Sequence, residues 1–235
     1  MKENKFLLLA ILFACILAFL NRRLNDSPIV ITSTDLIEVI ASDTVQHQAM
    51  NQFITSYKAQ KDANMNVVIG SCSEQLNVHS GEKALRNIVA DMMLYVAQEN
   101  HHADMAITNT GGIRRNLFAG NITIGDIYEI LPFDNSLVIL EYKGADLLDL
   151  ADAVAAKGGE ALSGMSLDIV DGKAENVMIA GAPIDTTRTY QVVTTDYLSW
   201  GNDNLTPLSR HINSTALNMM MRDAMIKYVK EKERL

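Results

Sequence analysis

Apolar side chains recur at helical spacing in several separated stretches of the chain. The clearest stretch begins at Leu85, where apolar residues occupy positions i, i+3, i+4, i+7, i+8 and i+11. This spacing places them on one face of a helix, and Ser80 is suited to cap its start. Further helices are expected over residues 43–59, 123–131 and 145–156, and from about residue 215 to the end of the chain.

Two of these expected helices carry end signals. Thr123-x-x-Asp126 resembles a capping box, and that helix must end before Pro132 because the proline ring disfavours helical geometry at the preceding residue. The last helix ends in basic residues, which suit the negative end of the helix dipole. Residues 196–204 carry neither signal and are expected to form a polar loop.

Short apolar stretches between the helices predict β-strands. These stretches are residues 66–69, 104–108, 137–142, 166–170, 176–180 and 190–195. Asp171-Gly172 predicts a hairpin turn, because glycine supplies the positive φ that tight turns require. Helices and strands interleave irregularly, which predicts a single compact α+β (mixed α/β) domain with a mixed sheet and packed helices.

The N-terminus has the pattern of a targeting segment. A short basic start is followed by an unbroken apolar stretch at residues 6–20 and then by Asn21-Arg22-Arg23. The stretch is shorter than the roughly 18 to 20 residues of a comfortable membrane-spanning helix, which favours a signal peptide. The alternatives are an uncleaved anchor, lipidation at Cys15 within a loose lipobox-like sequence, and a buried core helix.

These patterns give a domain organisation. Residues 1–24 are expected to be a signal peptide or membrane anchor, residues 25–42 a connector and residues 43–235 the folded domain. Export to the periplasm or cell envelope follows from this interpretation. Cys15 and Cys72 are too few for a disulfide framework.

The composition is that of a globular protein, and the charge balance does not predict nucleic acid as a partner. Apolar residues make up 48% of the chain and charged residues 20%, which is enough to bury a core. The formal net charge is −8, and no cluster of basic residues follows Arg23. Such a surface repels a polyanion, although a local arginine can still hold one small phosphate compound.

The sequence offers no recognisable catalytic or metal centre. The histidines His47, His79, His101, His102 and His211 stand outside every common metal-binding spacing. A Gly-x-Ser-x-Gly elbow, a Walker loop and a Gly-x-Gly-x-x-Gly fingerprint are also missing. We therefore expect no catalytic residue, no metal site and no cofactor within this chain.

Three loops carry the remaining candidate chemistry. Residues 109–114 follow a predicted buried strand and combine small residues with Asn109 and Arg114; residues 132–135 include Phe133; residues 197–204 combine aromatic residues with an acid. Taken singly, each is also explained by an ordinary turn or core contact. Taken together, aromatic rings for a base, an acid for ribose hydroxyls and an arginine for phosphate are what a nucleotide pocket needs.

With these loops in place, the chain resembles the C-terminal, substrate-binding domain of the 5′-nucleotidases, a family that includes UDP-sugar hydrolases and cyclic phosphodiesterases. The resemblance covers residues 43–235. Its matching segments occur in order, at residues 67–70, 82–92, 106–114, 120–135 and 181–185 and in the loop ending at Asp203.

The resemblance implies a role for each residue of the pocket. Phe133 and Tyr197 correspond to the aromatic pair that sandwiches the base, and Asp203 to the acid that binds ribose hydroxyls. The other substrate-binding positions are phosphate- and substrate-contacting residues of the Asn-Gly-Gly-Gly-Ile-Arg motif and a base-contacting asparagine. They are Asn109, Gly111, Gly112, Arg114 and Asn135.

The sequence departs from the family pattern at several points. Thr110 and Asp134 replace glycines, Asn204 ends a loop that is typically Gly-Gly-Asp-Gly, and His79 stands where a further substrate-binding arginine is expected. In two-domain members a metallophosphatase domain with divalent metals precedes the substrate-binding domain. The expectation is that a separate metallophosphatase chain supplies it, and that this chain alone is not active. The alternatives are a noncatalytic nucleoside- or nucleotide-binding module of the envelope and a degenerate scaffold without a ligand.

Overall fold

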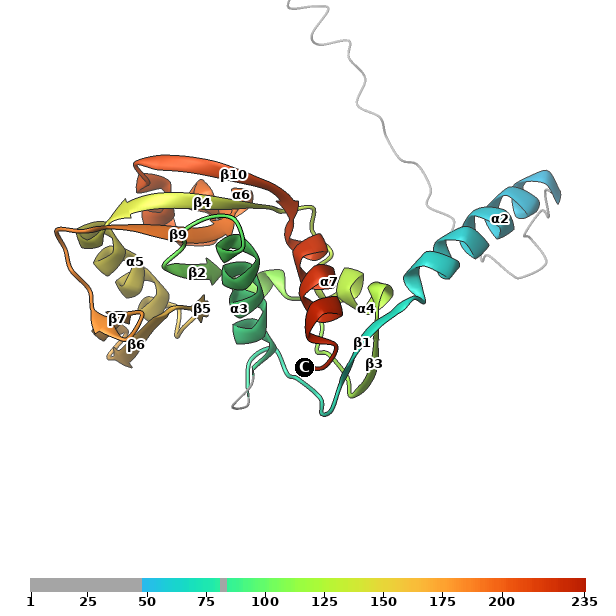
Figure 1. The fold of residues 1–235 in the computed structure, drawn as a ribbon, viewed down its shortest axis with the longest axis horizontal. Helices are drawn as coiled ribbons and strands as arrows, with labels where there is room; N and C mark the ends of the chain where they lie inside the picture. Colours follow the sequence, from blue (N-terminus) through green and yellow to red (C-terminus); the bar gives the residue numbers. More distant parts are fainter. Residues whose placement is uncertain (1–47, 81–83) are drawn as a thin grey trace, which may run out of the picture. The chain divides into compact units, whose positions relative to one another are not determined.

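A five-stranded mixed sheet organises residues 52–235 of the computed structural model, which describes residues 48–80 and 84–235 (Figure 1). Its strand order is β10-β4-β9-β2-β5. The strands are β2 (Met105–Thr108), β4 (Ser136–Lys143), β5 (Ala161–Ser163), β9 (Thr189–Thr195) and β10 (Asn213–Met220). β2 and β9 run parallel, and every other neighbouring pair in this sheet is antiparallel. The predicted mixed α+β fold is confirmed.

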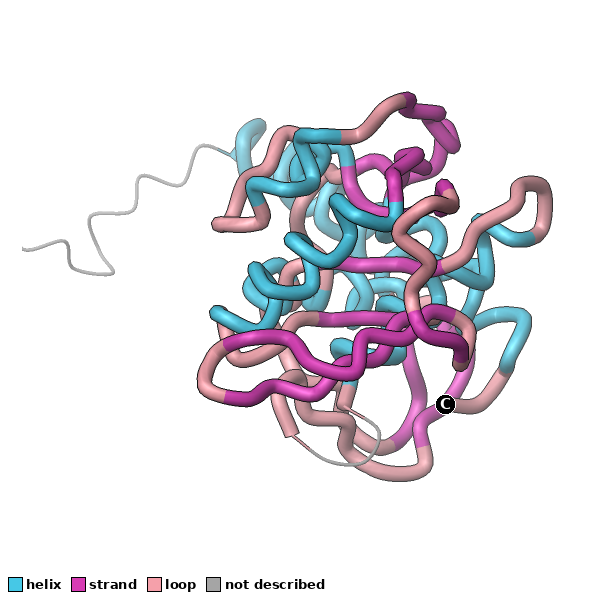
Figure 2. Tube along the Cα trace, turned by 90° about the vertical axis from the view of Figure 1, so that its left-hand side faces the viewer, coloured by secondary structure: helices cyan, strands magenta, loops and turns pink. Residues whose placement is uncertain are grey.

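Successive side chains of the central strands point to opposite faces of this sheet and build two separate cores. Ala106, Ile139 and Val193 belong to one apolar cluster, whereas their neighbours in β2, β4 and β9 belong to the other. The first cluster is completed by helices α3 (Leu85–Gln98), α4 (Ile124–Ile130) and α7 (Met221–Lys232). The second is completed by helix α5 (Gly144–Ala156) and the 3-10 helix η3 (Thr206–Arg210). Helices therefore cover both faces of the sheet, as Figures 1 and 2 show.

Two smaller sheets flank the central one. In the first, β1 (Val68–Cys72) pairs with β3 (Gly120–Thr123). In the second, β6 (Met165–Val170) and β7 (Lys173–Ile179) form the predicted hairpin, with Asp171 and Gly172 at positive φ, and β8 (Ala182–Pro183) adds a short edge. The second hairpin arm begins at Lys173, earlier than the alternation of side chains indicated.

The predicted amphipathic helix is confirmed as α3, and its apolar face is buried. Its start differs from the expectation: the N-cap is Ala84, without a side-chain hydrogen bond, and Ser80 does not cap the helix. The capping box of α4 is confirmed, since the Thr123 hydroxyl accepts from the Asp126 amide at 3.1 Å and the Asp126 carboxylate accepts from the Thr123 amide at 2.8 Å. Helix α2 (Gln48–Met65) extends beyond the predicted end near Ala59, and its aromatic residues Phe53 and Tyr57 are exposed.

The largest correction concerns residues 215–220, which we expected to begin the last helix. They belong to strand β10, which pairs with β4 from Asn213 opposite Glu141 to Met220 opposite Ser136. Leu217 and Met219 alternate inward against the core, so a strand period was misread as a helix period. Pairing with β4 overrides the local helical propensity. Residues 196–199 also differ from the expected loop and form the short helix α6 (Asp196–Ser199).

β1 continues through Gly70, where the sequence indicated the end of a strand. A Cβ at Gly70 would lie 2.7 Å from Cγ1 of Val229, so the glycine is needed for the close packing of α7. The predicted signal peptide or anchor and the predicted connector lie outside the described residues. No helix within residues 48–80 and 84–235 is both long and apolar enough to cross a membrane.

Candidate nucleotide pocket

Three loops meet at one edge of the central sheet. Because β2 and β9 are parallel, the segments that follow them leave from the same edge. They are the loop of residues 109–114 and the loop of residues 196–204, which begins with the short helix α6. β4 is antiparallel to β9, with Leu137 opposite Thr195, so the loop of residues 131–135 enters the sheet at this edge too. The carboxyl ends of parallel strands are a common place for ligand sites in open sheets, because the departing loops leave a crevice between them. The fold thus brings together the three loops singled out in the sequence.

The first loop turns immediately after β2. The Gly112 amide donates to the Asn109 carbonyl at 3.0 Å, which closes a 3-10 turn over Thr110–Gly112. A Cβ at Gly112 would lie 2.9 Å from Oδ1 of Asn109, so this glycine leaves room for the asparagine side chain. The Arg114 amide donates to the Ile130 carbonyl at 2.9 Å and fastens the end of the loop to α4.

The second loop, residues 131–135, is held by the start of α7. The Met221 amide donates to the Asn135 carbonyl at 2.9 Å. The Arg222 guanidinium donates to the Leu131 carbonyl at 3.3 Å, pairs with the Asp134 carboxylate and lies 4.2 Å from the centre of the Tyr128 ring. Phe133 and Asn135 are therefore carried on a segment with several fixed points.

The third loop, residues 196–204, is connected to the end of the second loop through Asp196. Its Oδ1 accepts from the amides of Tyr197 at 2.8 Å and Ser136 at 3.1 Å. The loop then bends sharply: Gly201 has a φ of 78°, and Asp203 and Asn204 each have a φ of 60°. These contacts place Tyr197 and Asp203 beside the first two loops.

A pocket of about 220 Å³ opens between the three loops. It is lined by six of the eight residues that the resemblance singled out: Asn109, Gly111, Gly112, Phe133, Asn135 and Tyr197. Phe133 and Tyr197 are 49% and 44% exposed, so both rings are accessible to a ligand. Rings with exposed faces and amide groups in one concave site suit a planar polar heterocycle.

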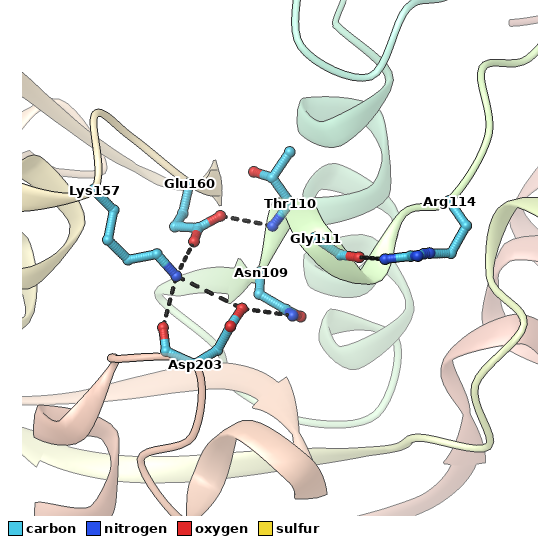
Figure 3. Close-up of polar contacts among 7 residues, drawn as sticks. All are labelled: Asn109, Thr110, Gly111, Arg114, Lys157, Glu160 and Asp203. Carbon is cyan, nitrogen blue, oxygen red and sulfur yellow. Dashed lines mark hydrogen bonds and ion pairs between the residues drawn. The ribbon is translucent and has the colours of Figure 1, made fainter.

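The other two expected residues, Arg114 and Asp203, do not line this pocket. Each is one hydrogen bond away from a residue that does (Figure 3). The side-chain amide (Nδ2) of Asn109 donates to Oδ2 of Asp203 at 2.8 Å, and the Arg114 guanidinium donates to the Gly111 carbonyl at 3.1 Å. The carboxylate and the guanidinium therefore flank the pocket.

The departures from the family pattern have local explanations. Neither Thr110 nor Asp134 has a positive φ, so replacing a glycine there introduces no backbone strain. The Thr110 amide donates to Glu160, and Asp134 pairs with Arg222. His79 is exposed.

Two charged residues that the sequence did not point to lie beside the site. Lys157 at the end of α5 pairs with Glu160 at 2.5 Å, and both contact the pocket loops (Figure 3). Gly158 and Gly159, with φ of 78° and 108°, make the tight turn that brings Glu160 back beside Lys157. A Lys-Gly-Gly-Glu segment by itself gives no sign of its distant partners.

The described residues do not fit a catalytic metal. Within residues 48–80 and 84–235, no group of three or more His, Cys, Asp and Glu side chains lies together in a way that could hold a metal ion. A dinuclear phosphoesterase centre requires such a cluster.

The chain belongs to the family described as the 5′-nucleotidase, C-terminal domain, whose model matches residues 63–210. It is 26% identical over 178 residues to a 5′-nucleotidase of Vibrio vulnificus, covering 73% of this chain and 32% of that protein. It is 29% identical over 168 residues to the protein UshA of Yersinia enterocolitica, covering 68% of this chain and 30% of that protein. The chain thus spans about a third of the length of these curated relatives.

Solved structures show the same fold. The 5′-nucleotidase precursor of Thermus thermophilus superposes with a TM-score of 0.69 at 24% identity, covering 80% of this chain and 41% of that one. The NAD nucleotidase of Haemophilus influenzae superposes with a TM-score of 0.62 at 21% identity, covering 80% and 39%. The resemblance seen in the sequence is confirmed at the level of family and fold.

Proposed function

We propose that this chain is the nucleotide- or nucleoside-recognition unit of a 5′-nucleotidase-type phosphoester hydrolase that acts in nucleotide catabolism. In this proposal Phe133 and Tyr197 sandwich the base, and Asn135 contacts its polar edge. Asp203 binds the ribose hydroxyls. The phosphate is bound by Arg114 and Asn109, together with the backbone of Gly111 and Gly112.

The observation that carries the proposal is the convergence of three loops, distant in sequence, on one pocket. Each loop brings a different chemistry: amides and glycines from residues 109–112, a ring and an amide from residues 133–135, and a second ring at Tyr197. Asp203 and Arg114 add opposite charges at its margin. A flat base, a sugar and a phosphate need this combination of partners.

The binding half of the proposal is tested by titrating adenosine and AMP into the purified chain by calorimetry. Saturable binding is expected, and Phe133→Ala is expected to weaken it about 5-fold or more, because stacking of a base on an aromatic ring contributes about 1–3 kcal/mol. Trp200 is the only tryptophan and lies three residues after Tyr197, so its fluorescence gives an independent signal.

Phe118→Ala is the matched control, because Phe118 is similarly exposed, at 51%, but does not line the pocket. Equal nucleotide affinity of the wild type, Phe133→Ala and Phe118→Ala would show that Phe133 does not bind the base. The absence of heat with every nucleoside and nucleotide would favour the degenerate scaffold instead.

We further propose that a metallophosphatase on a separate chain, carrying the divalent metals, performs the hydrolysis, and that the two meet in the periplasm or at the cell envelope. The matched family is a C-terminal domain, and within residues 48–80 and 84–235 no group of three or more His, Cys, Asp and Glu side chains could hold a metal ion. The expected result is no phosphate release from AMP and a divalent metal by this chain alone, and release when an exported metallophosphatase encoded by a neighbouring reading frame is added. Release at the same rate with and without any such partner would reject this division of labour.

The alternative is a noncatalytic envelope module that binds nucleosides or nucleotides. It shares the pocket and the effect of Phe133→Ala, so the two candidates differ only in hydrolysis. Tight binding without phosphate release in the presence of every metallophosphatase tested would support the module.

A further inference from the structure

A charged pair, Lys157 and the buried Glu160, lies beside the pocket and contacts two of its three loops. Glu160 follows α5, and its side chain is only 4% exposed. Its Oε2 accepts from the Thr110 amide at 2.6 Å, and its Oε1 pairs with the Lys157 ammonium at 2.5 Å (Figure 3). A carboxylate at this depth needs such partners, because burying an unpaired charge is strongly unfavourable. Glu160 thereby fixes the backbone at the start of residues 109–114.

Lys157 extends the same network to the third loop. Its ammonium donates to the Asp203 carbonyl at 2.6 Å and lies 3.6 Å from Oδ2 of Asp203. Asp203 has a φ of 60°, a left-handed conformation that is unfavourable for a residue with a Cβ. The Lys157 ammonium, whose side chain is 23% exposed, helps to hold it there through this hydrogen bond to its carbonyl.

The contacts also orient the Asp203 carboxylate. Lys157 and Asn109 both approach Oδ2. Among the described residues these polar contacts are all to Oδ2, which leaves Oδ1 able to accept from a ligand. A hydroxyl donor on the pocket side would therefore meet a carboxylate whose orientation is already set, which lowers the ordering cost of binding.

We propose that Lys157 and Glu160 are positioning residues for the ribose-binding carboxylate, acting by locking the loop of Asp203 to the loop of Asn109. This inference rests on the proposed function, in which Asp203 binds ribose hydroxyls. Neither residue touches the ligand. Their effect is specific to the sugar, because the base lies between side chains that the pair does not contact.

The test compares adenosine with 2′,3′-dideoxyadenosine, which lacks the hydroxyls that Asp203 would bind. Lys157→Met is expected to weaken adenosine binding about 10-fold, the size of coupling expected between residues in one ion-pair network, and to change dideoxyadenosine binding less than about 2-fold. Lys157→Arg is expected to restore most of the adenosine affinity. Lys173→Met is the matched control, because Lys173 is exposed on β7, away from the pocket loops.

A double-mutant cycle with Asp203→Ala separates positioning from general stability. If Lys157 acts through Asp203, then Lys157→Met has no further effect on adenosine binding once Asp203 is alanine. Should Lys157→Met fail to fold, Glu160→Gln tests the same claim. The side-chain carbonyl of glutamine can still accept from the Thr110 amide, but the negative charge that pairs with Lys157 is lost. Glu160→Gln is then expected to show the same selective loss of adenosine affinity.

The outcomes distinguish the two proposals. A wild-type chain that binds neither nucleoside overturns the proposed function. A wild type that binds adenosine and is weakened by Asp203→Ala, but not by Lys157→Met or Glu160→Gln, overturns only the positioning role. Equal losses for adenosine and dideoxyadenosine in the Lys157 and Glu160 variants also overturn it, since they would mark a general structural effect.

Discussion

At the scale of single residues, the third loop depends on backbone conformations that most side chains avoid. Gly201 has a φ of 78°, and a Cβ there would lie 3.0 Å from Cα of Thr206 and 3.1 Å from its carbonyl oxygen. Asn204, at a φ of 60°, replaces a glycine of the family pattern, and asparagine is among the residues that tolerate this conformation best. The loop that carries Asp203 can therefore bend without a glycine at each position.

Gly201→Ala is expected to destabilise the chain more than Gly181→Ala. Both glycines have a φ of 78°, but nothing lies within 4 Å of a Cβ at Gly181. The shared left-handed conformation costs alanine about 1–2 kcal/mol in each variant, and the contact with Thr206 adds to it only at Gly201. Urea unfolding measures both variants; equal losses would show that the approach of Thr206 is unimportant.

At the scale of elements, α7 supports the pocket although it contributes no residue to the proposed binding set. Its first residues bind the second loop through the amide of Met221 and the side chain of Arg222. The Arg222 side chain is only 12% exposed and lies over the ring of Tyr128 in α4. The position of Phe133 thus depends on the packing of two helices.

Arg222→Met is expected to destabilise the chain by about 1–3 kcal/mol, because a side chain that is only 12% exposed loses a charged hydrogen bond to Leu131 and a cation–π contact with Tyr128. Arg210→Met is the control: Arg210 pairs with Asp149 at 2.8 Å, but its side chain is 45% exposed. Exposed ion pairs contribute about 0–1 kcal/mol. Urea unfolding that gives the two variants the same loss would contradict this support by α7.

At the scale of the whole molecule, the sequence predicted the elements with strong local signals. The apolar face of α3, the capping box at Thr123 and the hairpin turn at Gly172 are all present. Each depends on residues close together in the chain, where spacing alone carries the information.

The errors and omissions are long-range. Strand β10 exists because it pairs with β4, and the partners of Lys157 and Glu160 lie in loops that meet only once the sheet has formed. For the site, the ordered family resemblance pointed to residues on all three pocket loops, six of which line the pocket. It did not point to the charged pair behind them, because no local pattern connects residue 157 with residue 203.

The most direct test of the account is a crystal structure of this chain grown with adenosine. The account predicts the base between the rings of Phe133 and Tyr197, with the ribose hydroxyls within hydrogen-bonding distance of the Asp203 carboxylate. Adenosine bound elsewhere, or bound in this pocket with its base away from both rings, would contradict it.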